Sequence, residues 1–67
     1  IINERKKLIA KIRQLETDVN TWENNIGFIA KSNKSQGLIN ELYSKIEKTK
    51  QRLALLQEKL KALDSLI

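Results

Sequence analysis

Acid–base chemistry in this chain would have to come from carboxylates, because its 67 residues include no histidine and no cysteine. Glu16, Asp18 and Glu23 are close together in the sequence. Two carboxylates can act on one substrate only when both converge in a sheltered cleft. On the helix expected here, Glu16 and Glu23 lie on one flank and Asp18 lies on the other. We therefore expect no catalytic residue, and the chain is not predicted to be an enzyme.

Ligand binding has equally little support in the residue types. Asn24 and Asn25 carry amide groups that could hydrogen-bond a ligand, but neighbouring helical positions diverge by about 100°. The simpler interpretation is that these amides are solvated near the end of the helix. The sequence also lacks a glycine-rich phosphate loop and a cluster of metal ligands. We expect no cofactor, no metal ion and no small-molecule ligand.

A row of cations is the second candidate site. Lys45, Arg52 and Lys59 recur every seven residues, and Lys11 joins them from the first half of the chain. The formal net charge is +5, with thirteen Lys and Arg. Such a stripe could follow the phosphates of RNA or DNA without reading their sequence. No aromatic residues interleave with it to stack on bases, and lysines on coiled coils also serve solubility.

Two long helices would carry these side chains. Apolar residues recur at alternating intervals of three and four, which is the spacing of the a and d positions of a heptad. The first series consists of Leu8, Ile12, Leu15, Val19, Trp22, Ile26 and Ile29. The second series consists of Ile39, Leu42, Ile46, Thr49, Leu53, Leu56, Leu60, Leu63 and Ile67, of which only Thr49 is polar.

The short polar segment between the two series predicts that the second helix folds back on the first. We expect a helix at about 1–31, a turn at about 32–36 and a helix at about 37–67, within a few residues. The predicted fold is therefore all-α, a single antiparallel two-helix coiled-coil hairpin over residues 1–67. Its hairpin core is the two apolar series without Thr49 and Ile67.

One antiparallel register matches the two series layer by layer. In this register Trp22 faces Ile46, every layer pairs an a position with a d position, and Arg5 lies opposite Leu63 near the termini. We therefore expect Trp22 to be largely buried against Ile46.

Flanking charges only partly favour this register. Asp18 is expected near Arg52 and Glu16 near Lys50, which are weak attractions of about 0.2–1 kcal/mol each if exposed. Lys11 is expected near Lys59, and this like-charge contact argues mildly against the register or for an anionic partner.

Gly27 is the least helical residue of the first segment. Inside a helix it costs about 1 kcal/mol relative to alanine. The alternative is a left-handed cap that folds Phe28 back toward Trp22. Because the apolar series continues past Gly27 to Ile29, we expect an uninterrupted helix.

The residues around Gly27, and those that follow them, also carry a family resemblance. The stretch TWENNIGFIAKSNKSQGLINELYSKIEKTKQRLALLQEKLKALDSL covers about two-thirds of the chain. It resembles the C-terminal helical segment of bacterial proteins carrying the domain of unknown function three-four-nine. The resemblance implies a bacterial, cytoplasmic, helical protein and no established activity. Its distinctive residues are Trp22, Glu23, Asn24, Asn25, Ile26 and Phe28.

The length and composition indicate a domain that needs support from outside. Chains of this size struggle to bury enough core to fold alone. The sequence has no proline, and 31% of its residues are charged, which suits long helices with solvated outer faces.

The sequence starts without methionine, so we expect a piece of a longer protein. No apolar run approaches the roughly 18 residues of a membrane span, so we expect no membrane partner and a cytoplasmic location.

Several apolar residues fall outside the two series and form the expected partner surface. They are Ile2, Ile9, Leu55, Ala62 and Leu66 in the half away from the turn, and Phe28, Leu38 and Tyr43 near it. A cluster of exposed apolar residues on a small domain marks a contact surface more often than scattered exposed apolar residues do. The expected partner is a protein, either a second copy of the chain or other helices of the parent protein, which would build a larger bundle.

The sequence therefore predicts a non-catalytic structural or interaction module of a larger bacterial protein. The alternative is a basic helical arm that contacts the backbone of RNA or DNA through its lysines and arginine. Salt separates the two hypotheses, because binding to phosphates weakens steeply as salt rises.

Overall fold

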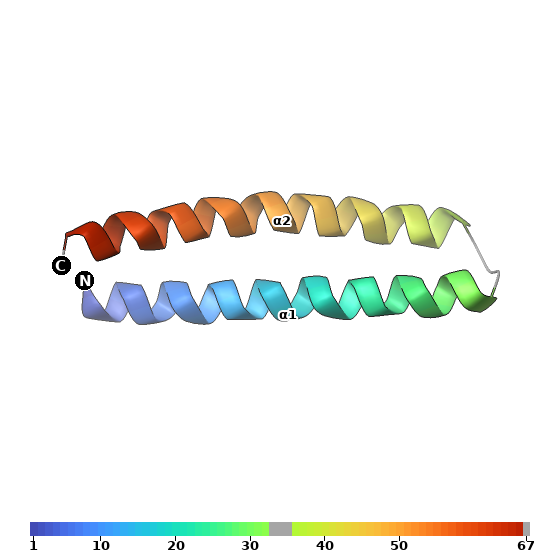
Figure 1. Ribbon diagram of the computed structural model, residues 1–67, viewed down its shortest axis with the longest axis horizontal. Coiled ribbons are helices and arrows are strands. Elements are labelled where there is room, and N and C mark those ends of the chain that lie inside the picture. The colour runs from blue at the N-terminus through green and yellow to red at the C-terminus, as the bar shows by residue number, and fades with distance from the viewer. Residues whose placement is uncertain (33–35, 67) are drawn as a thin grey trace.

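The chain forms an antiparallel hairpin of two long helices. The structure, a computed structural model, describes residues 1–32 and 36–66. Helix α1 spans Ile2–Ser32 and helix α2 spans Gln36–Ser65. The two helices lie side by side and run in opposite directions, so that the start of α1 and the end of α2 meet at one end (Figure 1). The predicted all-α two-helix hairpin is confirmed.

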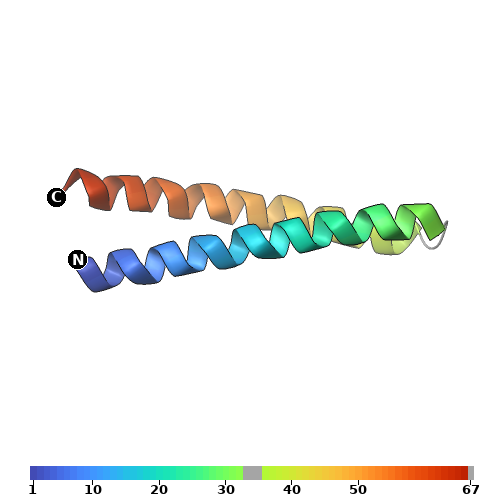
Figure 2. The same ribbon diagram turned by 60° about the horizontal axis from the view of Figure 1, so that its bottom comes forward.

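The hairpin is a thin rod whose Cα atoms span 50 × 15 × 12 Å. Figure 2 shows the helices overlapping near the turn and separated near the termini, so their axes are inclined to one another. Such an inclination is typical of helices that pack with a heptad spacing. Neither helix contains, in the ranges described, a segment long and apolar enough to cross a membrane.

The core is a single seam between α1 and α2. Its most buried side chains, 6–9% exposed, are Ile12, Leu15, Val19, Leu42 and Ile46. Every other residue predicted for the hairpin core is half-buried, and Ile67, the last of the second series, lies outside the described residues. Residues three and four apart share one face of a helix, so the two apolar series face each other and the charged residues remain in water. With only two helices, each core residue is covered from one side only.

The helix boundaries differ slightly from the expectation. Helix α1 continues through Gly27 to Ser32, as the apolar spacing predicts. A Cβ atom on Gly27 would have no neighbour within 4 Å. Helix α2 begins at Gln36 and ends at Ser65, one residue before and two residues before the expected limits. The centre of the predicted turn, residues 33–35, lies outside the described residues.

Two side chains are placed differently from the expectation. Trp22 is half-buried, which is less burial than expected, because an indole is larger than one layer of the seam between α1 and α2. Ile9, expected on the exposed partner surface, is also half-buried. It follows Leu8 and flanks the seam, so the edge of the interface shields part of it.

Candidate interaction surface

The two long flanks of the hairpin carry different charges. In an antiparallel pair, the e positions of both helices lie on one flank and the g positions lie on the other. The pairing flank is defined here by the e positions, with Glu23, Lys50 and Asp64. The basic flank is defined by the g positions and the c positions behind them. Its cations include Lys11, Lys45, Arg52 and Lys59, all of them exposed.

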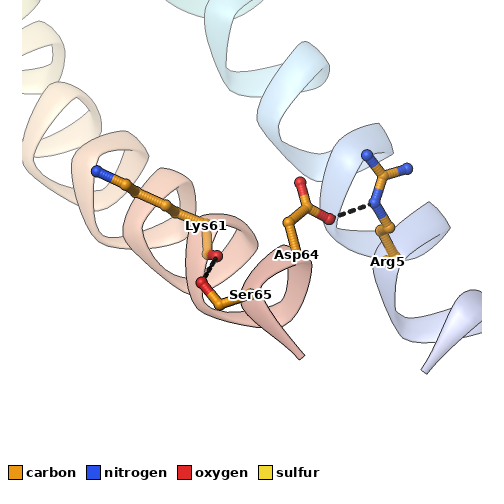
Figure 3. A network of polar contacts seen from close by, with 4 residues as sticks. All are labelled: Arg5, Lys61, Asp64 and Ser65. Atoms are coloured by element: carbon orange, nitrogen blue, oxygen red, sulfur yellow. Dashed lines mark hydrogen bonds and ion pairs between the residues drawn. The ribbon is translucent and has the colours of Figure 1, made fainter. Parts of the chain in front are cut away.

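Ion pairs tie the helices together along the pairing flank. The Arg5 Nε donates a hydrogen bond to Asp64 Oδ1 over 2.6 Å at the open end (Figure 3). Nearer the turn, Lys50 Nζ lies 3.8 Å from Glu23 Oε2. All four side chains are 41–53% exposed. Exposed pairs of this kind contribute little individually, so they specify the register more than they stabilise it.

Lys50 pairs with Glu23, one heptad closer to the turn than the expected Glu16. The direction of helical side chains explains the choice. Each Cα–Cβ bond tilts toward the N-terminus of its own helix. In an antiparallel hairpin Lys50 therefore leans toward the turn, and Glu23 leans toward the open end to meet it. Glu16 leans away from Lys50.

The contact between Arg5 and Asp64 also stabilises the charged form of the Arg5 side chain. The hydrogen bond to Asp64, and then the attraction between the two charges, raise the pKa of the Arg5 guanidinium above its ordinary value. Arg5 occupies a seam position, opposite Leu63, where the heptad would favour an apolar residue. The open end of the hairpin is thus closed by a charge pair.

A shallow open hollow of ≈ 400 Å³ lies on the basic flank at the open end. It brings Lys11 and Lys59 to one place, as the register predicts. Leu8 and Leu63 of the seam are half-buried and reach the hollow. Its lining residues are Glu4, Lys7, Leu8, Lys11, Lys59 and Leu63.

An exposed apolar row runs along α2 beside this hollow. Leu55 is 66% exposed and Leu66 is 74% exposed. Ala62 lies between them and is also exposed. Together with Lys59 these residues are spaced four, three and four apart, so they share one stripe of the helix surface.

The other residues of the expected partner surface lie elsewhere. Ile2 is 70% exposed and lines a hollow with Arg5 and Asp64, beside the pairing flank. Phe28 and Tyr43 are exposed toward the turn, as is Leu38. The structure therefore divides the expected surface into separate parts and joins only Leu55, Ala62 and Leu66 into a row.

Lys45 has a contact that the spacing did not predict. Its Nζ lies 5.9 Å from the centroid of the Trp22 ring, within the range of a cation–π interaction. The adjacent residue, Ile46, is buried, in agreement with the predicted layer of Trp22 and Ile46. The side chain of Lys45, which belongs to α2, therefore lies over one face of the indole.

The carboxylates considered for catalysis remain apart. Asp18 accepts a hydrogen bond from Gln14 Nε2 over 3.0 Å, and within the described ranges it forms no ion pair with Arg52, its expected partner. Glu16 lines a different, open hollow with Arg13, Thr17 and Asn20. Within the described ranges, no three carboxylates come close enough to hold a metal ion.

No protein-family model matches this chain, and comparisons with curated proteins and with solved structures find no significant match. The resemblance carried by Trp22, Glu23 and Phe28 stays a prediction.

Proposed function

We propose that this chain is a non-catalytic interaction module, a coiled-coil hairpin that packs against further helices. One observation carries the proposal. Within residues 1–32 and 36–66, seven large hydrophobic side chains are 44–75% exposed, whereas five hydrophobic side chains are buried. A stable small domain usually buries most of its large apolar groups. The unburied apolar surface is the part that a partner would cover.

The geometry explains why a partner is needed. A two-helix hairpin buries one stripe on each helix and leaves the rest of each circumference in water. A third helix would lie in the groove along one flank and cover both helices at once, as in helical bundles. Specific interfaces cover about 800 Å² per partner. That area is a modest share of the chain's accessible surface of 5387 Å².

The setting of the module follows from the resemblance. A bacterial, cytoplasmic parent protein with preceding helices would supply a partner in the same chain. A second copy of the chain is the other candidate partner. In both cases the hairpin contributes packing, and chemistry takes place elsewhere.

Sedimentation velocity and thermal melting of the 67-residue chain, over a wide range of concentrations, test the proposal. We expect a marginally stable hairpin whose melting temperature rises with concentration or on addition of a partner helix. Leu55→Lys and Leu66→Lys should reduce that gain. A fully stable monomer whose association and melting temperature are unchanged by both substitutions would refute the proposed function.

A second function is favoured by the cations of the basic flank. Lys7, Lys11 and Lys59 line one hollow, and their charges could contact the phosphates of RNA or DNA. Binding to a short RNA duplex should then fall steeply as salt rises. Replacing Lys45, Arg52 and Lys59 together by alanine should abolish the binding and leave helicity intact. An affinity for the RNA duplex that changes neither with salt nor with these substitutions would exclude this function.

A further inference from the structure

We propose that the basic flank binds an acidic amphipathic helix, which completes a three-helix bundle at the open half of the hairpin. The proposal rests on the proposed function, because it names the chemistry of the partner that the interaction module would take. Its occupant is a helix with leucine-like residues at heptad spacing, flanked by aspartate and glutamate.

The first support is a second heptad stripe on α2. Leu55, Lys59, Ala62 and Leu66 repeat the four-three spacing of the core seam, displaced around the helix toward the basic flank. A helix that presents two such stripes can pack against two neighbours at once. One stripe is occupied by α1. The second has its leucines 66% and 74% exposed.

The second support is the apolar floor of the adjacent hollow. Leu8 from α1 and Leu63 from α2 reach the hollow from the seam, with Lys7, Lys11 and Lys59 around them. An apolar side chain of a docked helix would enter between the two helices and touch both leucines. This floor connects the exposed stripe to the buried core, so a docked helix would extend one continuous apolar layer.

The third support is the unbalanced charge of this surface. Within the described ranges, both ion pairs between α1 and α2 involve the pairing flank. The three lysines of the hollow have no ion-pair partner there, and the only carboxylate in its lining is Glu4. Partner surfaces are arranged with complementary potentials. An acidic helix supplies the missing negative charge.

The same charges select among the possible occupants. A second copy docked flank to flank would bring further lysines against Lys11 and Lys59, which is unfavourable. A nucleic acid would neutralise the lysines but would leave Leu55 and Leu66 without an apolar contact. An acidic amphipathic helix satisfies both the leucines and the lysines.

Two synthetic helical peptides of about four heptads provide the probe. Both have leucine at a and d; one has glutamate at e and g, and the control has lysine there. Fluorescence anisotropy of each labelled peptide would be measured with the 67-residue chain and with three double variants. These are Lys11→Glu with Lys59→Glu, Arg13→Glu with Lys61→Glu, and Leu55→Gln with Leu66→Gln. The first two change the net charge equally, and Arg13 and Lys61 lie outside the basic flank.

The proposal predicts that the acidic peptide binds and the basic peptide does not. Reversing the charge of Lys11 and Lys59 should weaken binding by on the order of tenfold or more, whereas the matched reversal of Arg13 and Lys61 should have a clearly smaller effect. The glutamine variant should also weaken binding, with helicity by circular dichroism unchanged.

Three results would overturn it. Equal losses in the two charge-reversed variants would show unspecific attraction. Binding of an RNA duplex that the glutamine variant leaves unchanged, without binding of the acidic peptide, would assign the flank to nucleic acid. Self-association that depends on Leu55 and Leu66, without peptide binding, would assign it to a second copy and leave the proposed function intact. The proposed function itself fails only if the leucines affect neither association, stability nor binding.

Discussion

Arg5 and Asp64, 59 positions apart in the sequence, are joined by a hydrogen-bonded ion pair of 2.6 Å that ties the first turns of α1 to the last turns of α2. Arg5 takes a core position of the heptad and yet stays charged and hydrated. The apolar seam thus ends in an ion pair at the open end, on the flank opposite the surface that we assign to a partner helix.

Removing the negative charge of Asp64 should weaken the contact between the two helix ends without unfolding the hairpin. In Asp64→Asn we expect faster amide exchange in the first turns of α1 and a small fall in melting temperature, because exposed ion pairs contribute modestly. Glu58→Gln is the matched control, since Glu58 is an exposed carboxylate of α2 with no ion pair in the described ranges. Equal exchange rates in both variants would show that the pair does not hold the open end.

The raised pKa of Arg5 sets the sign of the pH dependence. A group whose pKa is higher in the folded chain stabilises the fold at every pH below its unfolded pKa, and this contribution is lost only as the pH rises through the folded value. For an arginine that range lies beyond ordinary alkaline conditions. We therefore expect the exchange difference between the chain and Asp64→Asn to persist from neutral pH to about pH 10. A difference that vanished on mild alkalinisation would contradict the pairing.

Truncating a buried leucine should be far more harmful than truncating an exposed one. Leu15 is 7% exposed and Leu55 is 66% exposed. Leu15→Ala should lower the free energy of unfolding by about 2–5 kcal/mol, enough to unfold so small a hairpin. Leu55→Ala in the isolated chain should cost less than about 0.5 kcal/mol. Thermal melts followed by circular dichroism compare the two, and similar losses would disprove the assigned core.

The half-buried Trp22 gives an optical test of the seam. Its fluorescence should be partly accessible to a neutral quencher, between the values of a buried and a free indole. Lys45→Ala should increase this accessibility and cost about 0.5–1 kcal/mol, because the ammonium group lies over the ring. Lys48→Ala is the control on the same helix. Full exposure of Trp22 in the folded chain would contradict the register.

Gly27 offers a gain in stability. Because it lies inside α1 with open space where a Cβ atom would be added, Gly27→Ala should stabilise the hairpin by about 1 kcal/mol. The reverse change at an exposed interior site of the same helix, Ala10→Gly, should destabilise it by a similar amount. A destabilising Gly27→Ala would mean that the helix needs a glycine there.

The heptad spacing was sufficient to predict the hairpin and its core. Alternating steps of three and four define one face of a helix, and two such faces in one short chain can satisfy each other only by folding back. The facing of Trp22 and Ile46, and the meeting of Lys11 and Lys59, follow from the same counting.

The flanks were harder to predict, because side-chain direction and size decide them. Counting positions placed Lys50 near Glu16, whereas the opposite tilts of side chains in antiparallel helices bring it to Glu23. Counting also placed Arg5 against Leu63 and gave no sign that its long side chain would reach the next residue, Asp64. The spacing marked Leu55 and Leu66 as surplus, but only the structure showed the basic hollow lined by Lys59, which lies on the same stripe of α2.

Hydrogen exchange of the 67-residue chain, alone and with the acidic peptide, tests the central claim most directly. That claim is that the hairpin is completed by a helix lying on the row from Leu55 to Leu66. The peptide should slow amide exchange in residues 55–66 of α2 severalfold or more, because the bound helix raises the free energy of local opening there. Unchanged exchange in residues 55–66 at peptide concentrations that saturate any binding would contradict the claim.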